Sequence, residues 1–489
     1  MDLKYGTWNV AAPEDGVVKE LCAAGFAPLT ARVLSARGCR SAAQARELLG
    51  TEQPLIDPLQ MKEMDRAVAV IRRAMEQKKK IAVFGDYDVD GITATCLLAD
   101  YLRTHGASCS FHIPGRIEEG YGLNAAAIEQ LAAQGVELIV SVDCGITAVE
   151  EAKLCKRLGV ELVITDHHEC KPELPEAAAV VDPHRIDRTY PHTDLSGVGI
   201  AFKLAAALEG DQDALARRYC DLFCLGPIAD VMPLRGENRR LVAEGLRAMQ
   251  QPERLGLRAL IEACDCGKQP ITASTVGYVL APRINAAGRM EHAELAVQLF
   301  LSREPAEAAR LAQTLCRLNR DRQTTEAEIY REATERLQTT HNSDCAIVLA
   351  GENWHQGVIG IVASRLCEEY CRPTFLICLN GERGKASSRS YGGFDLFRSL
   401  TELSPLLEDF GGHEFAAGFT ISRGNIDEFR RQICRRAEEF SAGGATKPTL
   451  QIDGEVPEEL LTEEDINGLD QLEPCGTSCP KPVFCLSEL

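Results

Sequence analysis

Residues 81–91 read Ile-Ala-Val-Phe-Gly-Asp-Tyr-Asp-Val-Asp-Gly. Ile81–Phe84 is a short apolar run typical of a buried strand, and three carboxylates follow it at alternate positions, on Asp86, Asp88 and Asp90. Carboxylates this close repel one another and stay ionised only around a cation. The stretch therefore predicts a sheet of an α/β fold with a metal site at its carboxyl edge. The alternative is a solvated acidic turn whose aspartates and glycines serve turn chemistry alone.

Three further segments end in the same kind of side chain. Residues 136–142 form a second apolar run, followed by Asp143, and the short apolar stretch 225–229 precedes Asp230. We interpret both as strand ends. Residues 160–165 form another apolar strand, which is followed by Asp166, His167 and His168. Because imidazole beside carboxylate suits a transition metal better than calcium, the pattern favours manganese.

The motifs resemble a known enzyme superfamily. Asp166-His167-His168 is similar to the signature of the DHH phosphoesterases, and Gly85–Gly91 is similar to their first motif. Within that superfamily the chain resembles the RecJ type of single-strand-specific exonuclease, from about residue 20 to its end. The other segments that carry this resemblance are residues 113–123, 195–204, 281–289, 354–365, 393–396 and 411–418.

The resemblance implies hydrolysis of phosphodiester bonds with two Mn²⁺ or Mg²⁺ ions. The metal ligands carried over are Asp86, Asp88, Asp90, Asp143, His167, His168 and Asp230, of which Asp143, His167 and His168 are the catalytic candidates. We expect Asp143 to bridge the ions because it follows a central strand. The remaining ligands divide into Asp88, His167 and Asp230 for one ion and Asp86 and Asp90 for the other, with His168 close to the phosphate. Asp166 is expected to orient the adjoining turn or a histidine.

The resemblance also implies a substrate side. Residues 384–390 are similar to a phosphate-binding segment in which Ser387 and Arg389 hold a phosphate, and His413 stands at a glycine turn that closes over substrate. The further candidates for substrate contacts are Arg116, Arg283, Asn285, Arg289, Gln323 and Arg365. Simpler interpretations stay open. The arginines could be ordinary surface residues, Gln323 could lie on a solvated helix face, and His413 could belong to a capped turn.

For the whole chain, the resemblance implies 5′-to-3′ removal of mononucleotides from single-stranded DNA in DNA repair and recombination. A helicase and a single-strand-binding protein are candidate partners. One alternative is a related phosphodiesterase acting on short oligoribonucleotides or cyclic dinucleotides. The other is a catalytically silent scaffold of a replication complex, which the presence of all seven metal candidates disfavours.

Composition sets outer limits on these functions. A chain of 489 residues is too long to fold around a single hydrophobic core, so we expect two or more domains. Its 45% apolar and 26% charged residues are typical of a globular protein. The net charge of −19 argues against broad coating of nucleic acid but allows a local basic groove. With neither a membrane-crossing apolar run nor a secretory signal, we expect a cytoplasmic enzyme away from membranes. The twenty scattered cysteines are expected to be reduced thiols; a zinc site at Cys264-x-Cys266 or Cys475-x3-Cys479 is the minority interpretation.

The alternation of apolar runs and helical stretches predicts two α/β domains joined by a long helix. Leu29–Gly38 is expected to be an amphipathic helix, the connecting helix to start at Pro305, and residues 441–446 to be a flexible linker. The predicted parts are a helical lead-in (1–65), a DHH catalytic domain with a mostly parallel sheet (66–235), a helical region with the connecting helix (236–340), a DHH-associated substrate-binding domain (341–440) and a partial tail resembling an OB fold (449–489).

Overall fold

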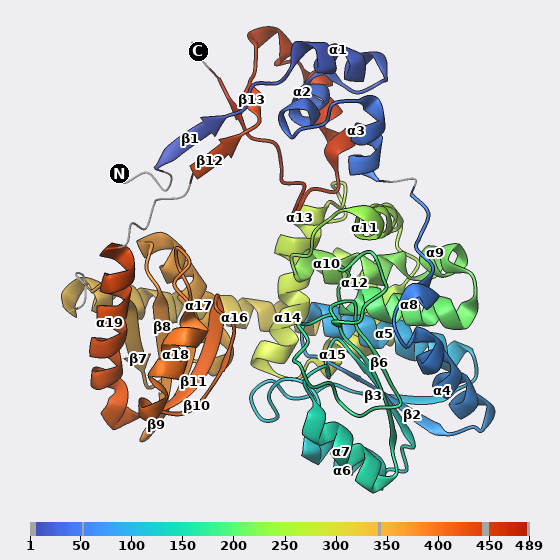
Figure 1. Cartoon of the computed structure of the whole chain (residues 1–489), viewed down its shortest axis with the longest axis vertical. Coiled ribbons are helices and arrows are strands. Elements are labelled where there is room, and N and C mark those ends of the chain that lie inside the picture. Colours follow the sequence, from blue (N-terminus) through green and yellow to red (C-terminus); the bar gives the residue numbers. More distant parts are fainter. Residues whose placement is uncertain (1–5, 51–52, 341–343, 443–448, 487–489) are drawn as a thin grey trace. The chain divides into compact units, whose positions relative to one another are not determined.

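The computed structural model describes residues 6–50, 53–340, 344–442 and 449–486 (Figure 1). Its contacts divide the chain into two compact units. The larger unit comprises residues 10–318 and 451–489, and the smaller unit comprises residues 1–9 and 319–450. Within the described ranges, no helix is both long and apolar enough to span a bilayer. All twenty cysteines are free thiols.

The larger unit is built on a five-stranded sheet of order β3-β2-β4-β5-β6 in which every neighbouring pair is parallel. Its strands are β2 (Lys80–Gly85), β3 (Ser108–His112), β4 (Leu138–Val142), β5 (Glu161–Thr165) and β6 (Ala179–Val181). The predicted parallel sheet is confirmed. Because β4 is the central strand, Asp143 directly follows the middle of the carboxyl edge.

Helices cover both faces of this sheet, as Figure 1 shows. Side chains alternate along a strand, so Ile81 and Val83 pack on one apolar core while Ala82 and Phe84 pack on the other. The first core includes α4 (Met64–Glu76), α5 (Val89–Thr104) and α8 (Gly197–Glu209). The second includes α6 (Ala125–Ala133) and α7 (Val149–Leu158).

A helical region follows the sheet, as predicted. Its elements are α9 (Gln212–Phe223), α10 (Leu225–Ala229), α11 (Gly236–Ala248), α12 (Leu255–Ala263), α13 (Ala273–Thr275), the π-helical turn η2 (Val276–Leu280), α14 (Ala281–Met290) and α15 (Glu294–Leu301). The interpretation of residues 225–229 as a strand was wrong, because they form α10 and Asp230 ends that helix. A five-residue apolar run has no period that separates strand from helix.

The two ends of the chain meet in one small apolar core. The N-terminal helices α1 (Asp15–Ala23), α2 (Pro28–Ala36) and α3 (Ala42–Leu49) share it with Leu472 of the tail. The tail contains β12 (Thr449–Ile452), β13 (Gly454–Glu455), α20 (Glu463–Gly468) and β14 (Phe484–Cys485). Strand β1 (Thr7–Val10), absent from the predicted helical lead-in, pairs with β12. Fully buried Arg239 donates to the carbonyls of Leu49, Leu472 and Pro474 and so fastens both ends to α11.

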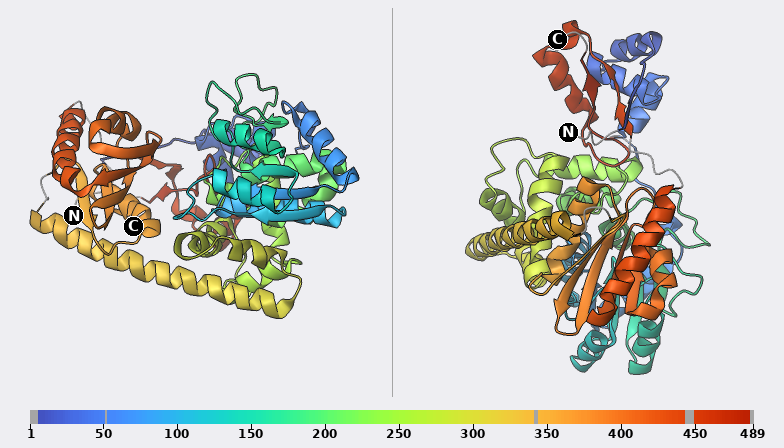
Figure 2. Two further views of the ribbon diagram at one scale, coloured as in Figure 1. Left: turned by 90° about the horizontal axis from the view of Figure 1, so that it is seen from below. Right: turned by 90° about the vertical axis from the view of Figure 1, so that its left-hand side faces the viewer.

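The smaller unit holds most of the long helix α16 (Pro305–Thr340), whose predicted start at Pro305 is confirmed (Figure 2). Its five-stranded sheet has the order β10-β11-β9-β8-β7, with only β7 and β8 parallel. The strands are β7 (Ile347–Gly351), β8 (Thr374–Asn380), β9 (Arg383–Arg389), β10 (Leu407–Gly412) and β11 (Ala416–Ser422), and the helices are α17 (Gln356–Tyr370), α18 (Leu396–Glu402) and α19 (Ile426–Ala442).

The expected linker at residues 441–446 begins inside α19, which extends through Ala442. Its remaining residues, 443–446, lie outside the described residues. Short 3-10 turns complete the described structure at Pro58–Gln60, Ser404–Leu406, Arg423–Asn425, Glu458–Leu460 and Leu469–Leu472.

Candidate metal centre

The carboxyl edge of the parallel sheet gathers the predicted metal ligands. Because β2, β4 and β5 are neighbours and run the same way, the residues that follow them lie side by side. Three sets of possible ligand atoms, each within 4.8 Å of one another, occur here. These sets are Asp143, His167 and His168; Asp90, His167 and Asp230; and Asp86, Asp88 and Asp143. Together they contain all seven candidates, and none of the sets found among the described residues includes a cysteine.

The grouping differs from the expected division at two residues. Asp143 belongs to two sets, in keeping with a bridging position, but Asp90 groups with Asp230 and Asp88 groups with Asp86. The reason is the start of α5. Asp88 is the N-cap of this helix, and its Oδ1 accepts hydrogen bonds from the backbone N–H groups of Asp90 and Gly91. Asp90 already lies in the first turn, which carries its side chain toward α8 and α10.

The Asp90 carboxylate is held by the N-terminus of α8. It accepts hydrogen bonds from Ser196 Oγ at 3.0 Å, from the Val198 N–H at 2.9 Å and from the Gly197 N–H. Backbone donors at a helix start favour a negative charge. Burial and the nearby Asp230 nevertheless raise the pKa of Asp90 to about 8. Without a cation, this carboxyl is therefore largely protonated at pH 7, and a bound cation would replace the proton.

Within the described part of the chain, two of the metal candidates have a buried carboxylate oxygen without a hydrogen-bond partner, Asp86 Oδ1 and Asp143 Oδ1. Burial, and then neighbouring carboxylates, raise the pKa of both groups well above the usual range. Burial and Asp88 raise the pKa of Asp230 to about 7. Buried polar atoms are normally paired, and a bound cation would replace the protons that such carboxyls retain. The donor set therefore fits divalent cations.

The surroundings of His167 also favour binding of a divalent cation. Burial and the adjacent His168 lower the pKa of His167 to about 3, so its ring is neutral at pH 7, the form that binds metals. Its Nε2 lies 3.1 Å from Asp143 Oδ1, 3.7 Å from an oxygen of Asp230 and 3.8 Å from an oxygen of Asp90. A neutral nitrogen surrounded by three carboxyl groups could bind a metal ion.

His168 differs from His167 in being positively charged at pH 7, and Asp166 is the cause. Asp166 Oδ1 accepts hydrogen bonds from His168 Nδ1 at 2.7 Å and from the His167 N–H at 2.8 Å, while Oδ2 accepts from the Ile146 N–H. Although burial opposes it, Asp166 raises the pKa of His168 to about 9. A protonated imidazole here suits a phosphate oxygen. Asp166 contacts both the turn and a histidine, as the sequence led us to expect.

Two tyrosines beside the centre were not anticipated. The Tyr121 hydroxyl lies 3.2 Å from His168 Nδ1 and 3.3 Å from the Asp143 carbonyl oxygen, to which it donates. The Arg116 guanidinium stacks 4.6 Å from the centre of the Tyr87 ring, and Arg289 also lies near Tyr87. Tyr121 lies in a segment that carries the resemblance, but only the folded loop brings it back to His168.

The other candidates on α14 have different surroundings. Arg283 donates from Nη1 to the Val279 carbonyl at 2.6 Å and lies near the thiols of Cys264 and Cys266. Asn285 is half-buried on the same helix. Gly288 permits close contact with the first motif, because a Cβ there would lie 2.8 Å from the Tyr87 carbonyl oxygen.

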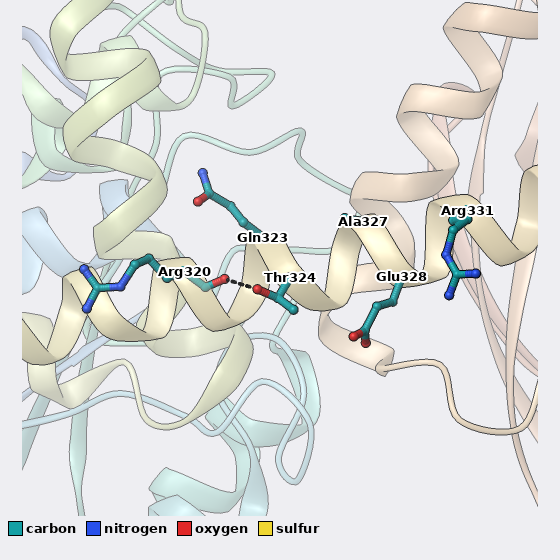
Figure 3. Close-up of a pocket in the computed structure, with 6 residues that line it drawn as sticks. All are labelled: Arg320, Gln323, Thr324, Ala327, Glu328 and Arg331. Carbon is teal, nitrogen blue, oxygen red and sulfur yellow. Dashed lines mark hydrogen bonds between the residues drawn. The ribbon is translucent and has the colours of Figure 1, made fainter.

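The remaining candidates lie in the smaller unit. On β9, Arg389 Nη1 donates to Ser387 Oγ at 3.1 Å, which brings the two predicted phosphate ligands together. His413 is exposed at the turn between β10 and β11. Gln323 is exposed on α16, where it projects near Arg320 and Thr324 (Figure 3). Arg365 on α17 stacks on Tyr330 of α16.

Replacing Gly226 by alanine should weaken metal binding. A Cβ at this position would lie 2.1 Å from Asp90 Oδ1, so the carboxylate must move. We expect the affinity for Mn²⁺ to fall by about 10- to 100-fold, the range seen when the support of a metal ligand is disturbed. Isothermal titration with Mn²⁺ measures it. Gly16→Ala, where a Cβ meets nothing within 4 Å, is the matched control, and equal affinities of the two variants would contradict this geometry.

Comparisons with known proteins agree with this architecture. A model of the DHH family N-terminal domain matches residues 80–227, and a model of the DHHA1 domain matches residues 343–439. The single-stranded-DNA-specific exonuclease RecJ of Bacillus subtilis is 40% identical over 479 residues, covering 97% of this chain and 61% of that protein. The protein of the same name from Dickeya dadantii is 34% identical, covering 93% of this chain and 83% of that protein.

A solved structure is similar along almost the whole chain. The crystal structure of RecJ in complex with Mn²⁺ from Thermus thermophilus matches with a TM-score of 0.84 and 33% sequence identity. The match covers 98% of this chain and 69% of that chain.

Proposed function

Because this chain belongs to the RecJ family of single-stranded-DNA-specific exonucleases, we propose that it hydrolyses the phosphodiester bonds of single-stranded DNA from the 5′ end. The observation that carries the proposal is the pair of buried, unpartnered oxygens on Asp86 and Asp143 within a cluster that matches the family's metal motifs. The chain spans 61% of the length of the Bacillus subtilis relative, and the activity is proposed for this span.

We propose that the cluster holds two divalent cations, Mn²⁺ or Mg²⁺. The residues that would hold them are Asp86, Asp88, Asp90, Asp143, His167 and Asp230. His168, the seventh candidate, would hold an ion only as a neutral ring and otherwise faces the phosphate. Such a pair of ions supplies an activated water and neutralises charge on the phosphate and the leaving oxygen. Asp143 and His167 each belong to two ligand sets. Only a carboxylate has two oxygens with which it could contact two ions, so Asp143 would be the bridge.

The protein's own residues would orient the substrate. Asp166 keeps His168 protonated and fixed, so that its N–H can bind an oxygen of the scissile phosphate. Ser387 and Arg389 of the smaller unit would hold a phosphate of the strand, with Arg365 and His413 as further contacts. On the larger unit, the proposed contacts to the strand are Arg116, Arg283, Asn285 and Arg289, and on α16 the proposed contact is Gln323.

We further propose that the protein acts in the cytoplasm in DNA repair and recombination. A reducing compartment agrees with twenty free thiols. A helicase and a single-strand-binding protein are the proposed partners, since an exonuclease of this kind requires an exposed single strand.

A labelled oligonucleotide tests the activity and its direction. Single-stranded DNA labelled at the 5′ or the 3′ end is incubated with Mn²⁺, beside matched RNA and duplex DNA. We expect immediate release of labelled mononucleotide from the 5′-labelled single strand alone. Cleavage of very short RNA only would instead indicate an oligoribonucleotide phosphodiesterase, and no cleavage of any substrate would favour the silent scaffold.

A further inference from the structure

The guanidinium of Arg365 is stacked flat on an aromatic ring. Its central carbon lies 3.7 Å from the centre of the Tyr330 ring, a contact between α17 and α16 inside the smaller unit. Arg365 is otherwise exposed, and within the described residues it has no hydrogen bond or ion pair. A stacked guanidinium keeps its N–H edge open for two parallel hydrogen bonds to a phosphate.

In the part of the chain that the structure describes, Arg365 forms no ion pair with a glutamate of its own helix. Glu369 follows Arg365 by four residues on α17, the spacing at which arginine and glutamate commonly pair on a helix. Some pairs in this chain with the same order do so, such as Arg240 with Glu244, Arg331 with Glu335, and Arg398 with Glu402. Among the described residues, Arg258 and Glu262 on α12 do not. The Glu369 carboxylate instead accepts a hydrogen bond from the Tyr330 hydroxyl. Tyr330 thus contacts both residues: its ring stacks on Arg365, and its hydroxyl donates to Glu369.

The helix that carries the stacked arginine also contacts the phosphate residues of the proposed function. Ser364, its neighbour on α17, accepts a hydrogen bond from Arg389 Nε at 3.0 Å. One turn earlier, a Cβ at Gly360 would lie 2.9 Å from Ser387 Oγ. The helix that carries Arg365 therefore packs directly against the Ser387–Arg389 pair.

We propose that Tyr330 is a positioning residue that withholds Glu369 from Arg365 and so keeps the Arg365 guanidinium available for a phosphate of the DNA strand. This inference rests on the proposed function and deepens it. Tyr330 itself need not touch the substrate. Its effect is exerted through Arg365, which distinguishes it from a residue that merely packs α16 against α17.

Binding of a 5′-phosphorylated, 3′-fluorescent oligo-dT, followed by anisotropy in EDTA so that hydrolysis is stopped, tests the inference. Tyr330→Phe keeps the ring but frees Glu369 to pair with Arg365, so we expect Kd to rise by about three- to tenfold, as for the loss of one hydrogen bond of ordinary strength. Adding Glu369→Gln should restore affinity close to that of the wild type. A purely structural contact would not be rescued by this second change.

Epistasis with Arg365 gives a second measure. In an Arg365→Ala background, Tyr330→Phe should have no further effect, and the slope of log Kd against log salt should already be smaller by about 0.7, the value for one phosphate contact on a single strand. Arg398→Ala, which removes an exposed arginine paired with Glu402 on α18, is the matched control and should leave Kd unchanged.

The possible outcomes separate this inference from the proposed function. An unchanged Kd in Tyr330→Phe, failure of Glu369→Gln to rescue it, or additive effects with Arg365→Ala each overturn the positioning role. Binding by the wild type without cleavage in Mn²⁺ contradicts the proposed function and leaves the variants interpretable. A wild type that does not bind the oligonucleotide overturns both.

Discussion

Replacing Asp143 by alanine should lower the rate of single-stranded-DNA hydrolysis to less than about a thousandth of the wild-type rate, a loss of roughly 4 kcal/mol of transition-state stabilisation. Asp143 is shared by two of the three ligand sets, so its removal would disturb both ions at once. Cleavage of 5′-labelled single-stranded DNA in Mn²⁺ measures the effect. Substantial activity in this variant would be incompatible with a shared, bridging carboxylate.

Two controls separate a lost ligand from a lost fold. Asp65→Ala removes an exposed carboxylate from α4 and should keep full activity. Asp143→Asn preserves the side-chain shape, and asparagine tolerates the left-handed backbone found here, with φ of 61°. Because Asp143 Oδ1 is buried without a partner, the metal-free asparagine variant should melt no lower than the metal-free wild type. Mn²⁺ should then stabilise the wild type and have little effect on the variant.

Replacing Lys203 by methionine should destabilise the larger unit by about 3–5 kcal/mol, because it strips the cation from a buried ion pair. Lys203 is fully buried, and its Nζ donates to the Ile56 carbonyl at 2.8 Å, to Gln212 Oε1 at 2.9 Å and to the Glu237 carboxylate. Without this cation, the donors that buried Glu237 keeps among the described residues are neutral, the Tyr190 hydroxyl and the Ile56 N–H. Thermal and urea unfolding measure the loss.

The matched comparison is an exposed ion pair. Lys156 and Glu176 retain relative exposures of 67% and 71%, and Lys156→Met should cost less than about 1 kcal/mol. Adding Glu237→Leu to Lys203→Met should recover much of the loss, since a buried charge without a partner costs more than an apolar pair of similar volume. Equal effects of the two lysine substitutions would show that burial does not set the cost.

Local patterns in the sequence were sufficient to predict the strands that carry the candidate metal centre. The apolar run 81–84 is followed by three alternating aspartates, and this order of residues predicts a buried strand that ends in charge. The same reasoning placed Asp143 after the central strand, which the structure confirms. Parallel strands align their carboxyl ends whatever the rest of the chain does, so motifs that follow such strands must converge.

The grouping of the ligands depended on contacts that no local pattern contains. Asp230 ends a helix, and Asp88 caps α5 while Asp90 turns to the start of α8. Tyr121 reaches His168 through a loop. The positions of these side chains follow from where helices start, how side chains pack and how a loop folds back on the sheet. All three depend on residues far apart in the sequence.

The sequence by itself determined the parallel sheet, the long helix and the acidic strand ends after β2 and β4, because strand and helix periodicities and strand-end chemistry are local properties. The set of seven candidate ligands came from the resemblance to the family. Only the tertiary structure decided which carboxylates share a neighbour, how the two chain ends meet around Arg239, and that Tyr330 separates Arg365 from Glu369. A side chain's charge state and its available partners are set by the distances and burial around it, and those arise only when segments distant in sequence pack together.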